Sequence, residues 1–510
     1  MTALDTRVSR ASLRWAALRR AAVDHGAALT LPAIGSLVAL VLLTVSAGYG
    51  FHRDELYFIV AGRHPALGYV DQPPLTPLLS AVSAAVLGVS PTAVRLLPAL
   101  VAAAVVVLTG LMAREFGADR RGQSLAAITA AISGVLAEGH LDHTTTYDLL
   151  AWALILWLVT RLLGGADRRL WLAVGLVAGI GLENKDTPLF LGAGLAAGVL
   201  ISRRSDVLRC GWTWAALALA LGLWAPNLAW QAANGWPEIA MAHAIAGEAS
   251  TNRALLLPML LLFAGPLLFP VSVAGFRWLL LGRSAAPWRP LGIAFGVIVA
   301  LVVVTGGKFY YAAAFVPVLI AAGAIVLAGW LARGHVRLRW AAFGAGGVFS
   351  GAIMTVLVLP ILPPATLAST PIPNLYDASV EQIGWPDYVA TVEHVVQSLP
   401  PAPRAHAAIL TNNYAEAGAL QLLGAGLPPV YSGHNSFWDW GPPPADRTTV
   451  VLVGIELYWW PAALFETCHL VATLDNGYGI RDQEQGHPVS VCTGLLRPWS
   501  EIWPGLRHVD

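Results

Sequence analysis

Long stretches without charge, which recur along the chain, constrain its fold more than any other feature. The first runs from Leu31 to Gly50, and about 20 apolar residues are enough to cross the hydrocarbon core of a bilayer. Hydrophobic residues make up 56% of the 510 residues and charged residues 12%, about half the charged fraction of a typical soluble domain. The sequence therefore predicts an all-α polytopic membrane protein.

We expect about eleven transmembrane helices, because apolar runs recur as far as residue 361. The expected spans are 31–50, 92–113, 122–138, 147–163, 170–183, 188–201, 212–231, 254–281, 290–305, 309–331 and 340–361. Arginine-rich loops alternate with acidic loops, and the positive-inside rule places the arginine-rich loops in the cytoplasm. The arginine-rich segment 1–30 is then cytoplasmic, and the loop 51–91 faces outside. Within that loop, the apolar segment 74–87 is too short to cross and is expected to lie along the membrane surface.

Residues 31–361 are therefore expected to form a membrane domain and residues 362–510 a separate domain. A cluster of prolines marks the change, and beyond it the composition alternates between strands and helices. Strands are expected at 405–411, 448–454, 470–474 and 489–493, and helices at 386–399 and 414–423. The sequence predicts an extracytoplasmic α/β domain, in which Cys468 and Cys492 can form a disulfide.

The distribution of ionisable residues favours an enzyme. The acidic residues lie near the outer ends of the expected spans or in the loops beside them, and the middle of the spans is almost free of charge. A pump or channel places charges midway across the membrane, so a lipid or solute transporter is the weaker alternative. The formal net charge is +1 and no basic stripe is present, so a nucleic-acid partner is not expected.

Four short motifs together resemble glycosyltransferase family 39. They are His52–Tyr57, Asp71–Leu75, Tyr147–Leu150 and Gly307–Tyr311, and they follow one another in the family's order. That family includes the protein O-mannosyltransferases and the lipid A aminoarabinose transferase, which share the GT-C fold. The resemblance covers residues 31–361, and the abundance of Ala, Gly, Arg and Trp is typical of a GC-rich bacterial gene.

The resemblance implies an inverting glycosyltransferase, multi-pass in a bacterial plasma membrane. It would move a hexose or pentose from a polyprenyl-phosphate donor to a hydroxyl of an acceptor glycan, lipid or protein on the outer face. A ligase that transfers a whole glycan from a lipid diphosphate is the alternative among enzymes. A non-catalytic scaffold of the cell envelope is another, in which the carboxylates would tolerate replacement.

The implied reaction assigns roles to residues of the motifs. The acceptor hydroxyl needs a general base, which the resemblance places at Asp54, with Glu55 orienting Asp54 or the acceptor. Asp148 is expected to bind donor hydroxyls or to stabilise the oxocarbenium-like transition state. The departing lipid phosphate needs positive charge, for which the candidates are Lys308, Arg253 and Lys185.

Further residues are expected to contact the donor sugar or the acceptor, namely Tyr57, Asp71, Gln72, Tyr147 and Tyr310. No cofactor is certain, but some family members hold a divalent metal, and the corresponding ligands here are Asp71 and His243. The group His140, Asp142 and His143 offers a second set of ligands, although its spacing matches no zinc signature. Because the aminoarabinose transferase has a lysine where this chain has Gln72, the resemblance does not predict the sugar.

Overall fold

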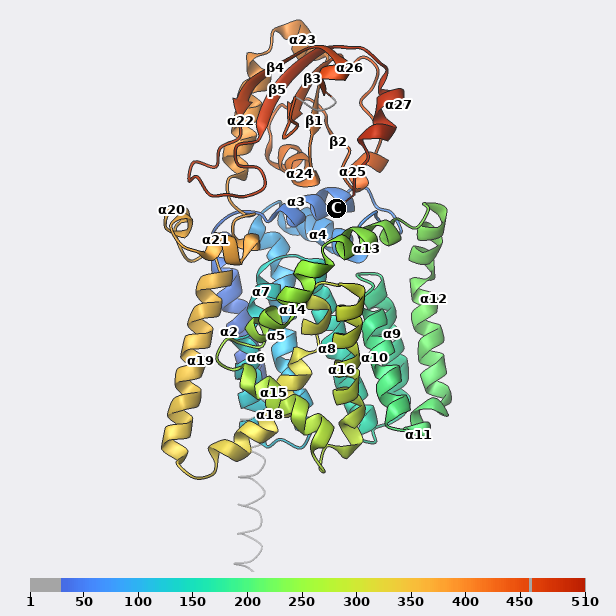
Figure 1. The fold of residues 1–510 in the computed structure, drawn as a ribbon, viewed down its shortest axis with the longest axis vertical. Helices are drawn as coiled ribbons and strands as arrows, with labels where there is room; N and C mark the ends of the chain where they lie inside the picture. Colours follow the sequence, from blue (N-terminus) through green and yellow to red (C-terminus); the bar gives the residue numbers. More distant parts are fainter. Residues whose placement is uncertain (1–28, 458–460, 510) are drawn as a thin grey trace, which may run out of the picture.

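The computed structural model describes residues 29–457 and 461–509, so nearly all of the arginine-rich segment 1–30 lies outside the described residues. A bundle of helices forms one part of the molecule, and a small α/β domain covers one end of the bundle (Figure 1). Three helices lie across that end, close to the α/β domain: α3 (Arg53–Gly62), α4 (Leu75–Leu87) and α13 (Pro237–Gly247).

The first part contains further helices as well. They are α2 (Thr30–Val45), α5 (Pro91–Glu115), α6 (Arg120–Ala131), α7 (Val135–His140), α8 (Thr144–Leu163), α9 (Leu170–Leu182), α10 (Pro188–Ile201), α11 (Ser205–Leu208), α12 (Gly211–Ala233), α14 (Ala249–Phe263), α15 (Phe269–Leu281), η1 (Ala286–Trp288), α16 (Arg289–Thr305), α17 (Tyr310–Ala313), α18 (Val316–Leu331) and α19 (Val336–Val358). In the described part of the chain, four segments are long and apolar enough to cross a membrane: α5, α8, η1 with α16, and α19. Seven further apolar helices are shorter, so the expected count of about eleven spans stays a prediction.

Three of the expected spans are interrupted. The expected span 122–138 divides into α6 and α7 next to Gly134, where a Cβ atom would lie 2.2 Å from the ring of Phe263. The span 254–281 divides into α14 and α15 near Gly265, whose φ of +99° ends the first helix. The span 309–331 divides into α17 and α18. Hydropathy reports apolar composition along a segment and does not register the glycines at the first two breaks. The third break, at residues 314–315, contains no glycine.

Small residues bring the helices of the bundle close together. A Cβ atom on Gly275 of α15 would lie 1.9 Å from the carbonyl oxygen of Leu319, and one on Gly323 of α18 would lie 2.0 Å from that of Val271. Such contacts between small residues are how helices associate in a membrane, where the hydrophobic effect contributes little. Helix α18 is consequently buried along most of its length.

The C-terminal domain is built on one five-stranded sheet of order β2-β1-β3-β5-β4. Strand β1 is parallel to β2 and β3, and β5 is antiparallel to β3 and β4. The strands are β1 (Ala407–Thr411), β2 (Val430–Ser432), β3 (Thr449–Val453), β4 (Phe465–Thr473) and β5 (Pro488–Leu495). A disulfide joins Cys468 of β4 to Cys492 of β5. The pairing of these cysteines and four of the five strands agree with the sequence-based expectations; the short strand β2 was missed.

Helices surround this sheet and connect it to the bundle. The connection contains α20 (Pro364–Ala368), α21 (Ile372–Leu375) and η2 (Asp377–Ser379). The domain itself contains α22 (Trp385–Ser398), α23 (Pro401–Ala405), α24 (Tyr414–Leu423), α25 (Ser436–Asp439), α26 (Pro461–Leu464), α27 (Trp499–Ile502) and η3 (Trp503–Leu506). Helix α24 lies directly against α3 (Figure 1). The α/β domain therefore contacts the segment between α2 and α5, in part through this pair of helices.

Candidate active site

Helix α3 begins with a capping arrangement that presents Asp54. His52 is the N-cap residue: its Nδ1 accepts a hydrogen bond from the backbone N–H of Asp54 at 3.2 Å, and its own backbone N–H donates to Glu55 Oε2 at 2.8 Å. These reciprocal bonds satisfy helix N–H groups that otherwise lack partners. Asp54 thus lies in the first turn of α3, where the helix dipole favours a negative charge.

The Glu55 carboxylate is fully buried, and its partners are all internal. Arg95 of α5 donates to both of its oxygens, at 2.8 and 2.7 Å, and the backbone N–H of Asp142 donates to Oε1 at 3.0 Å. Burial raises the pKa of Glu55, but Arg95 and these hydrogen bonds outweigh burial and bring the pKa below its ordinary value. Because both oxygens are engaged, Glu55 anchors α3 on α5, and the expected contact of Glu55 with the acceptor does not fit the structure.

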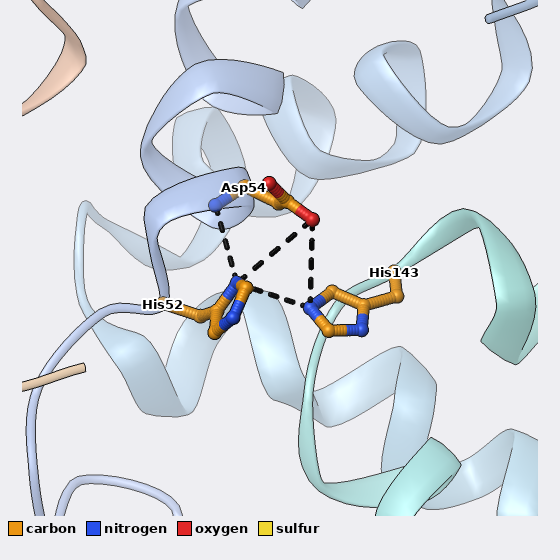
Figure 2. Close-up of side chains that lie close together, drawn as sticks. All are labelled: His52, Asp54 and His143. Carbon is orange, nitrogen blue, oxygen red and sulfur yellow. Dashed lines mark hydrogen bonds and ion pairs between the residues drawn. The ribbon is translucent and has the colours of Figure 1, made fainter. Parts of the chain in front are cut away.

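Asp54, in contrast, is partly open, with a side chain 31% exposed. Its Oδ1 accepts a hydrogen bond from the phenol of Tyr414 in α24 at 2.8 Å. Its Oδ2 lies 4.0 Å from His52 Nδ1 and 3.8 Å from His143 Nε2 (Figure 2). Burial raises the pKa of Asp54, but the two histidines, Arg53 and the phenol lower it by more, so the net pKa is below the ordinary value. Asp54 is therefore a charged carboxylate at neutral pH, able to accept a proton.

His52, Asp54 and His143 also form the one group of three close metal-ligand side chains in the described part of the chain. His52 Nδ1 and His143 Nε2 are 3.1 Å apart. Burial and the neighbouring His52 lower the pKa of His143 to about 4, so this ring is neutral, as metal binding requires. Two imidazoles and a carboxylate suit zinc, with ligand distances of about 2.0–2.2 Å and a fourth position left open. The three side chains fit a divalent metal if the hydrogen bond from the Asp54 N–H to His52 Nδ1 breaks, which frees Nδ1 to bind the ion.

The metal ligands expected from the sequence are arranged differently. His243 is exposed on α13, and Asp71 is hydrogen-bonded to Tyr57, so neither belongs to the group of three. Of the second expected set, Asp142 is engaged by other side chains, at Oδ2 by Ser80 at 2.6 Å. The pair Asp71 and His243 therefore stays a prediction without support from the geometry.

Lys185 lies at the junction of several charged groups. It follows α9, and its Nζ donates to Thr144 Oγ1 at 2.9 Å and lies 4.8 Å from the centre of the Tyr310 ring. Burial and Lys308 lower the pKa of Lys185, and they outweigh the opposite effect of the acidic groups within reach, which are Asp148, Glu138 and Asp54. The structure therefore gathers Asp54, Asp148, Lys185, Lys308 and Tyr310 at the end of the bundle that α3 covers.

Asp148 is almost completely buried on α8, with 2% exposed. Its Oδ1 has no hydrogen-bond partner among the described residues. A buried polar atom that is left without a hydrogen bond costs on the order of 1–3 kcal/mol. Such an atom is expected where a ligand donates the missing bond, as a sugar hydroxyl would.

The other two predicted phosphate-binding residues lie next to each other at the end of α16. Lys308 Nζ is 4.0 Å from Glu248 Oε2, and both side chains are exposed. Arg253 donates to the carbonyl oxygens of Val303 and Val304 at 2.8 and 3.3 Å. Arg253 therefore stabilises the last turn of α16, and Lys308 carries the freer charge.

Three of the predicted sugar-binding residues, Tyr57, Asp71 and Tyr147, have hydrogen-bond partners within the structure. Tyr57 donates to Asp71 Oδ1 at 2.8 Å, and Tyr147 donates to Asp142 Oδ1 at 2.7 Å. Burial raises the pKa of Asp71 to about 7. Gln72 is 5% exposed. With the exception of Asp71, these side chains are largely enclosed, and their contact with a sugar stays a prediction.

Residues that the sequence did not single out complete the surroundings of Asp54. Tyr414 belongs to a domain whose role was not predicted. Glu381, in the connection between the domains, has Oε2 3.2 Å from His52 Nε2 and Oε1 3.4 Å from an Nη atom of Arg53. No local pattern marks either residue, because both meet α3 only through the tertiary fold.

Comparisons with known proteins agree with this fold. The profile of the dolichyl-phosphate-mannose-protein mannosyltransferase family matches residues 71–230. Apo ArnT from Cupriavidus metallidurans has a similar structure, with a TM-score of 0.57, 13% identity, and coverage of 92% of this chain and 98% of that chain. ArnT from the same organism bound to undecaprenyl phosphate gives a TM-score of 0.54, 15% identity, and coverage of 90% and 97%. No curated protein sequence matches the chain.

At these identities the structural likeness shows the fold, and the family match covers the part of the chain that carries the second and third motifs. The resemblance inferred from the motifs is confirmed. The chain has the GT-C fold seen in ArnT and, over residues 71–230, is similar to the family of dolichyl-phosphate-mannose-protein mannosyltransferases.

Proposed function

We propose that this protein transfers a sugar from a polyprenyl-phosphate donor to an acceptor hydroxyl at the outer face of a membrane, with inversion at the anomeric carbon. The observation that carries the proposal is the position of Asp54. It is an ionised, partly open carboxylate that shares one end of the bundle with a buried acid, Asp148, and with two lysines. An inverting transfer needs a base on one side of the anomeric carbon and positive charge on the other.

Asp54 is the general base in this proposal. One oxygen is held by Tyr414, and the other, Oδ2, remains available to accept the proton of the attacking hydroxyl. As the acceptor oxygen forms its bond to the anomeric carbon, the bond from that carbon to the phosphate oxygen breaks, and the proton moves to Oδ2. A positioned base of this kind contributes about 10²- to 10⁴-fold to the rate.

Lys185 and Lys308 neutralise the phosphate as it leaves. Lys185 is held by Thr144 and by the Tyr310 ring, so it is pre-positioned, and the exposed Lys308 lies within electrostatic reach of Lys185. ArnT is described with undecaprenyl phosphate bound, and a comparable lipid phosphate is the donor that two lysines at the end of a helix bundle would suit. Asp148 Oδ1 is proposed to accept a hydrogen bond from a hydroxyl of the donor sugar.

The site is proposed to face an extracytoplasmic compartment. The disulfide between Cys468 and Cys492 lies in the domain that covers Asp54, and disulfides persist mainly in oxidising compartments. The domain and the site then belong to the same, outer side of the membrane.

A divalent metal at His52, Asp54 and His143 would compete with the role of Asp54 as base, because Oδ2 is the oxygen that faces both histidines. Isothermal titration with Zn²⁺ and Mn²⁺ after removal of metal by a chelator tests this site. His143→Ala is expected to weaken binding at least about tenfold if it removes a ligand, while His243→Ala is expected to leave the affinity unchanged. Equal affinity in all three proteins would exclude a metal at this group.

The function is tested by offering the purified protein a panel of polyprenyl-phosphate sugars and analysing the lipid products by mass spectrometry. The unaltered protein is expected to release the sugar from one donor, and Asp54→Asn is expected to lose about 10²- to 10⁴-fold in turnover while still binding that donor. Asp387→Asn, at an exposed position of α22, serves as the matched control. Full turnover in Asp54→Asn would overturn the assignment of the base.

A further inference from the structure

The C-terminal domain reaches the proposed base directly. The phenol of Tyr414 donates a hydrogen bond to Asp54 Oδ1 at 2.8 Å, across a sequence separation of 360 residues. Asp54 Oδ2, by contrast, has the two histidine rings at 3.8 and 4.0 Å and lacks a comparable short bond to either ring. The contact therefore distinguishes the two carboxylate oxygens: the domain holds one and leaves the other free.

Tyr414 is itself held from several sides. It is the first residue of α24, whose N-cap Asn413 accepts hydrogen bonds from the backbone N–H groups of Ala415 and Glu416 at 2.9 Å each. The backbone N–H of Tyr414 donates to His434 Nδ1 at 3.3 Å. Helix capping and this bond fix the backbone from which the ring projects toward Asp54.

The ring of Tyr414 is also packed between two residues of α3. Its centre lies 4.8 Å from that of the Tyr57 ring, and the guanidinium of Arg53 lies 5.0 Å from it. Arg53 is in turn paired with Glu381 at 3.4 Å. The phenol therefore has little freedom to leave Asp54 while the two helices remain together.

Helices α3 and α24 meet along an apolar surface that belongs to the C-terminal domain's own core. Leu56 and Ile59 of α3 are fully buried in the same cluster as Ala415 and Ala419 of α24. At Gly418, an added Cβ atom would lie 3.0 Å from the backbone of Leu56. The helix that carries Asp54 is thus packed as an element of the α/β domain as much as of the bundle.

From these contacts we infer that the C-terminal α/β domain forms part of the active site, and that Tyr414 is the positioning residue that holds Asp54 with Oδ2 turned toward the acceptor. The effect of Tyr414 on catalysis rests on the proposed function, whereas the contact between the domain and Asp54 rests on the hydrogen bond alone. Loss of the phenol oxygen leaves Oδ1 without this donor, and the carboxylate is then free to rotate toward the histidines. A misplacement of about 1 Å in a reacting group lowers the rate by up to about 100-fold.

The test compares Tyr414→Phe with two controls. Ser436→Ala removes another hydrogen bond between the domain and the outer loop, the one that the Val70 N–H donates to Ser436 Oγ at 3.1 Å. Tyr388→Phe makes the same chemical change within the domain, where the phenol donates to Asp482. Tyr414→Phe is expected to lower kcat about 10- to 100-fold with unchanged donor affinity, and both controls are expected to stay within about twofold of the unaltered protein.

A second measurement does not depend on activity. Thermal stabilities of Asp54→Ala, which removes the acceptor oxygen, of Tyr414→Phe and of the double variant form a cycle, and the two changes are expected to be non-additive because the residues are in contact. Additive shifts in Tm would contradict an energetic coupling between Tyr414 and Asp54. Equal losses of kcat in Tyr414→Phe and Ser436→Ala, or a loss of donor affinity alone, would overturn the positioning role. If the unaltered protein transferred no sugar but the Tm shifts were non-additive, the proposed function and the catalytic role of Tyr414 would both be refuted. The contact between Tyr414 and Asp54 would still be supported.

Discussion

Replacement of Arg95 by methionine is expected to destabilise the protein, because it leaves the Glu55 carboxylate buried without its cation. Arg95 is 1% exposed and Glu55 is fully buried, and three hydrogen bonds from the guanidinium end on Glu55 or on the carbonyl oxygen of Gly50 at 2.7–2.8 Å. Another reaches the carbonyl of Ser46. Removal of one partner of such a buried pair typically reduces the free energy of unfolding by about 3–5 kcal/mol.

This loss can be followed as a shift in the midpoint of thermal unfolding in detergent. The unfolding entropy of a folded protein is about 2.1 cal/mol/K per residue, so a loss of about 4 kcal/mol lowers the Tm of a chain of this length by roughly 4 °C if it unfolds cooperatively. Arg114→Met is the control, since Arg114 pairs with Glu115 at 3.1 Å but is 53% exposed, and an exposed pair contributes about 0–1 kcal/mol.

The double variant Glu55→Gln with Arg95→Met sharpens the reasoning. It leaves no charge buried, and the amide oxygen of the glutamine can still accept one of the two backbone N–H groups that donate to Glu55. We therefore expect the double variant to be more stable than Arg95→Met alone. A Tm for Arg95→Met within about 1 °C of the unaltered protein, or a double variant less stable than the single one, would refute the argument that a buried ion pair fixes α3 on α5.

Three further outcomes are expected. Burial raises the pKa of Asp71 from 3.8 to about 7, so its contribution to stability is complete below the lower value and is lost as the pH rises to the higher one. Between these two pH values the Tm of the unaltered protein should fall more than that of Asp71→Asn. Parallel curves would show that Asp71 does not cause the pH dependence. Lys185→Met should weaken binding of a polyprenyl phosphate at least about tenfold, measured by titration, whereas an unchanged affinity would remove Lys185 from the phosphate site. The loop closed between Cys468 and Cys492 has a sequence separation of 24, so Cys468→Ser with Cys492→Ser should cost about 3 kcal/mol of domain stability, and an unaltered thermal transition of the domain would contradict this estimate.

The sequence predicted the parts of the structure that depend on local patterns. Helix α24 was expected at 414–423 and is found at Tyr414–Leu423, because a capping residue and regular apolar spacing define it. Asp54 was identified because it stands in a compact motif at the end of an apolar run. Both signals lie within a few neighbouring residues, where periodicity and capping are informative.

What the sequence could not predict depends on tertiary contacts. Glu55 and Asp54 are adjacent and chemically alike, yet one is bound to Arg95 and the other faces His143, and only the packing of α3 on α5 separates their roles. Tyr414 and Asp54 are 360 residues apart in the sequence, so no local periodicity indicates that they are in contact. Two of the three breaks in the expected spans lie at glycines, Gly134 and Gly265, whose packing and backbone conformation hydropathy does not record.

The sharing of α3 between two parts of the molecule has a consequence for its biosynthesis. Leu56 and Ile59 emerge from the ribosome long before the segments that enclose them, which begin at Trp385. Until translation reaches those segments, α3 lacks the apolar partners that the C-terminal domain supplies, and the nascent chain carries an incompletely packed helix. Complete packing of α3 is thus a late event, and chains that stop after α19 would lack the residues that the C-terminal domain places beside Asp54.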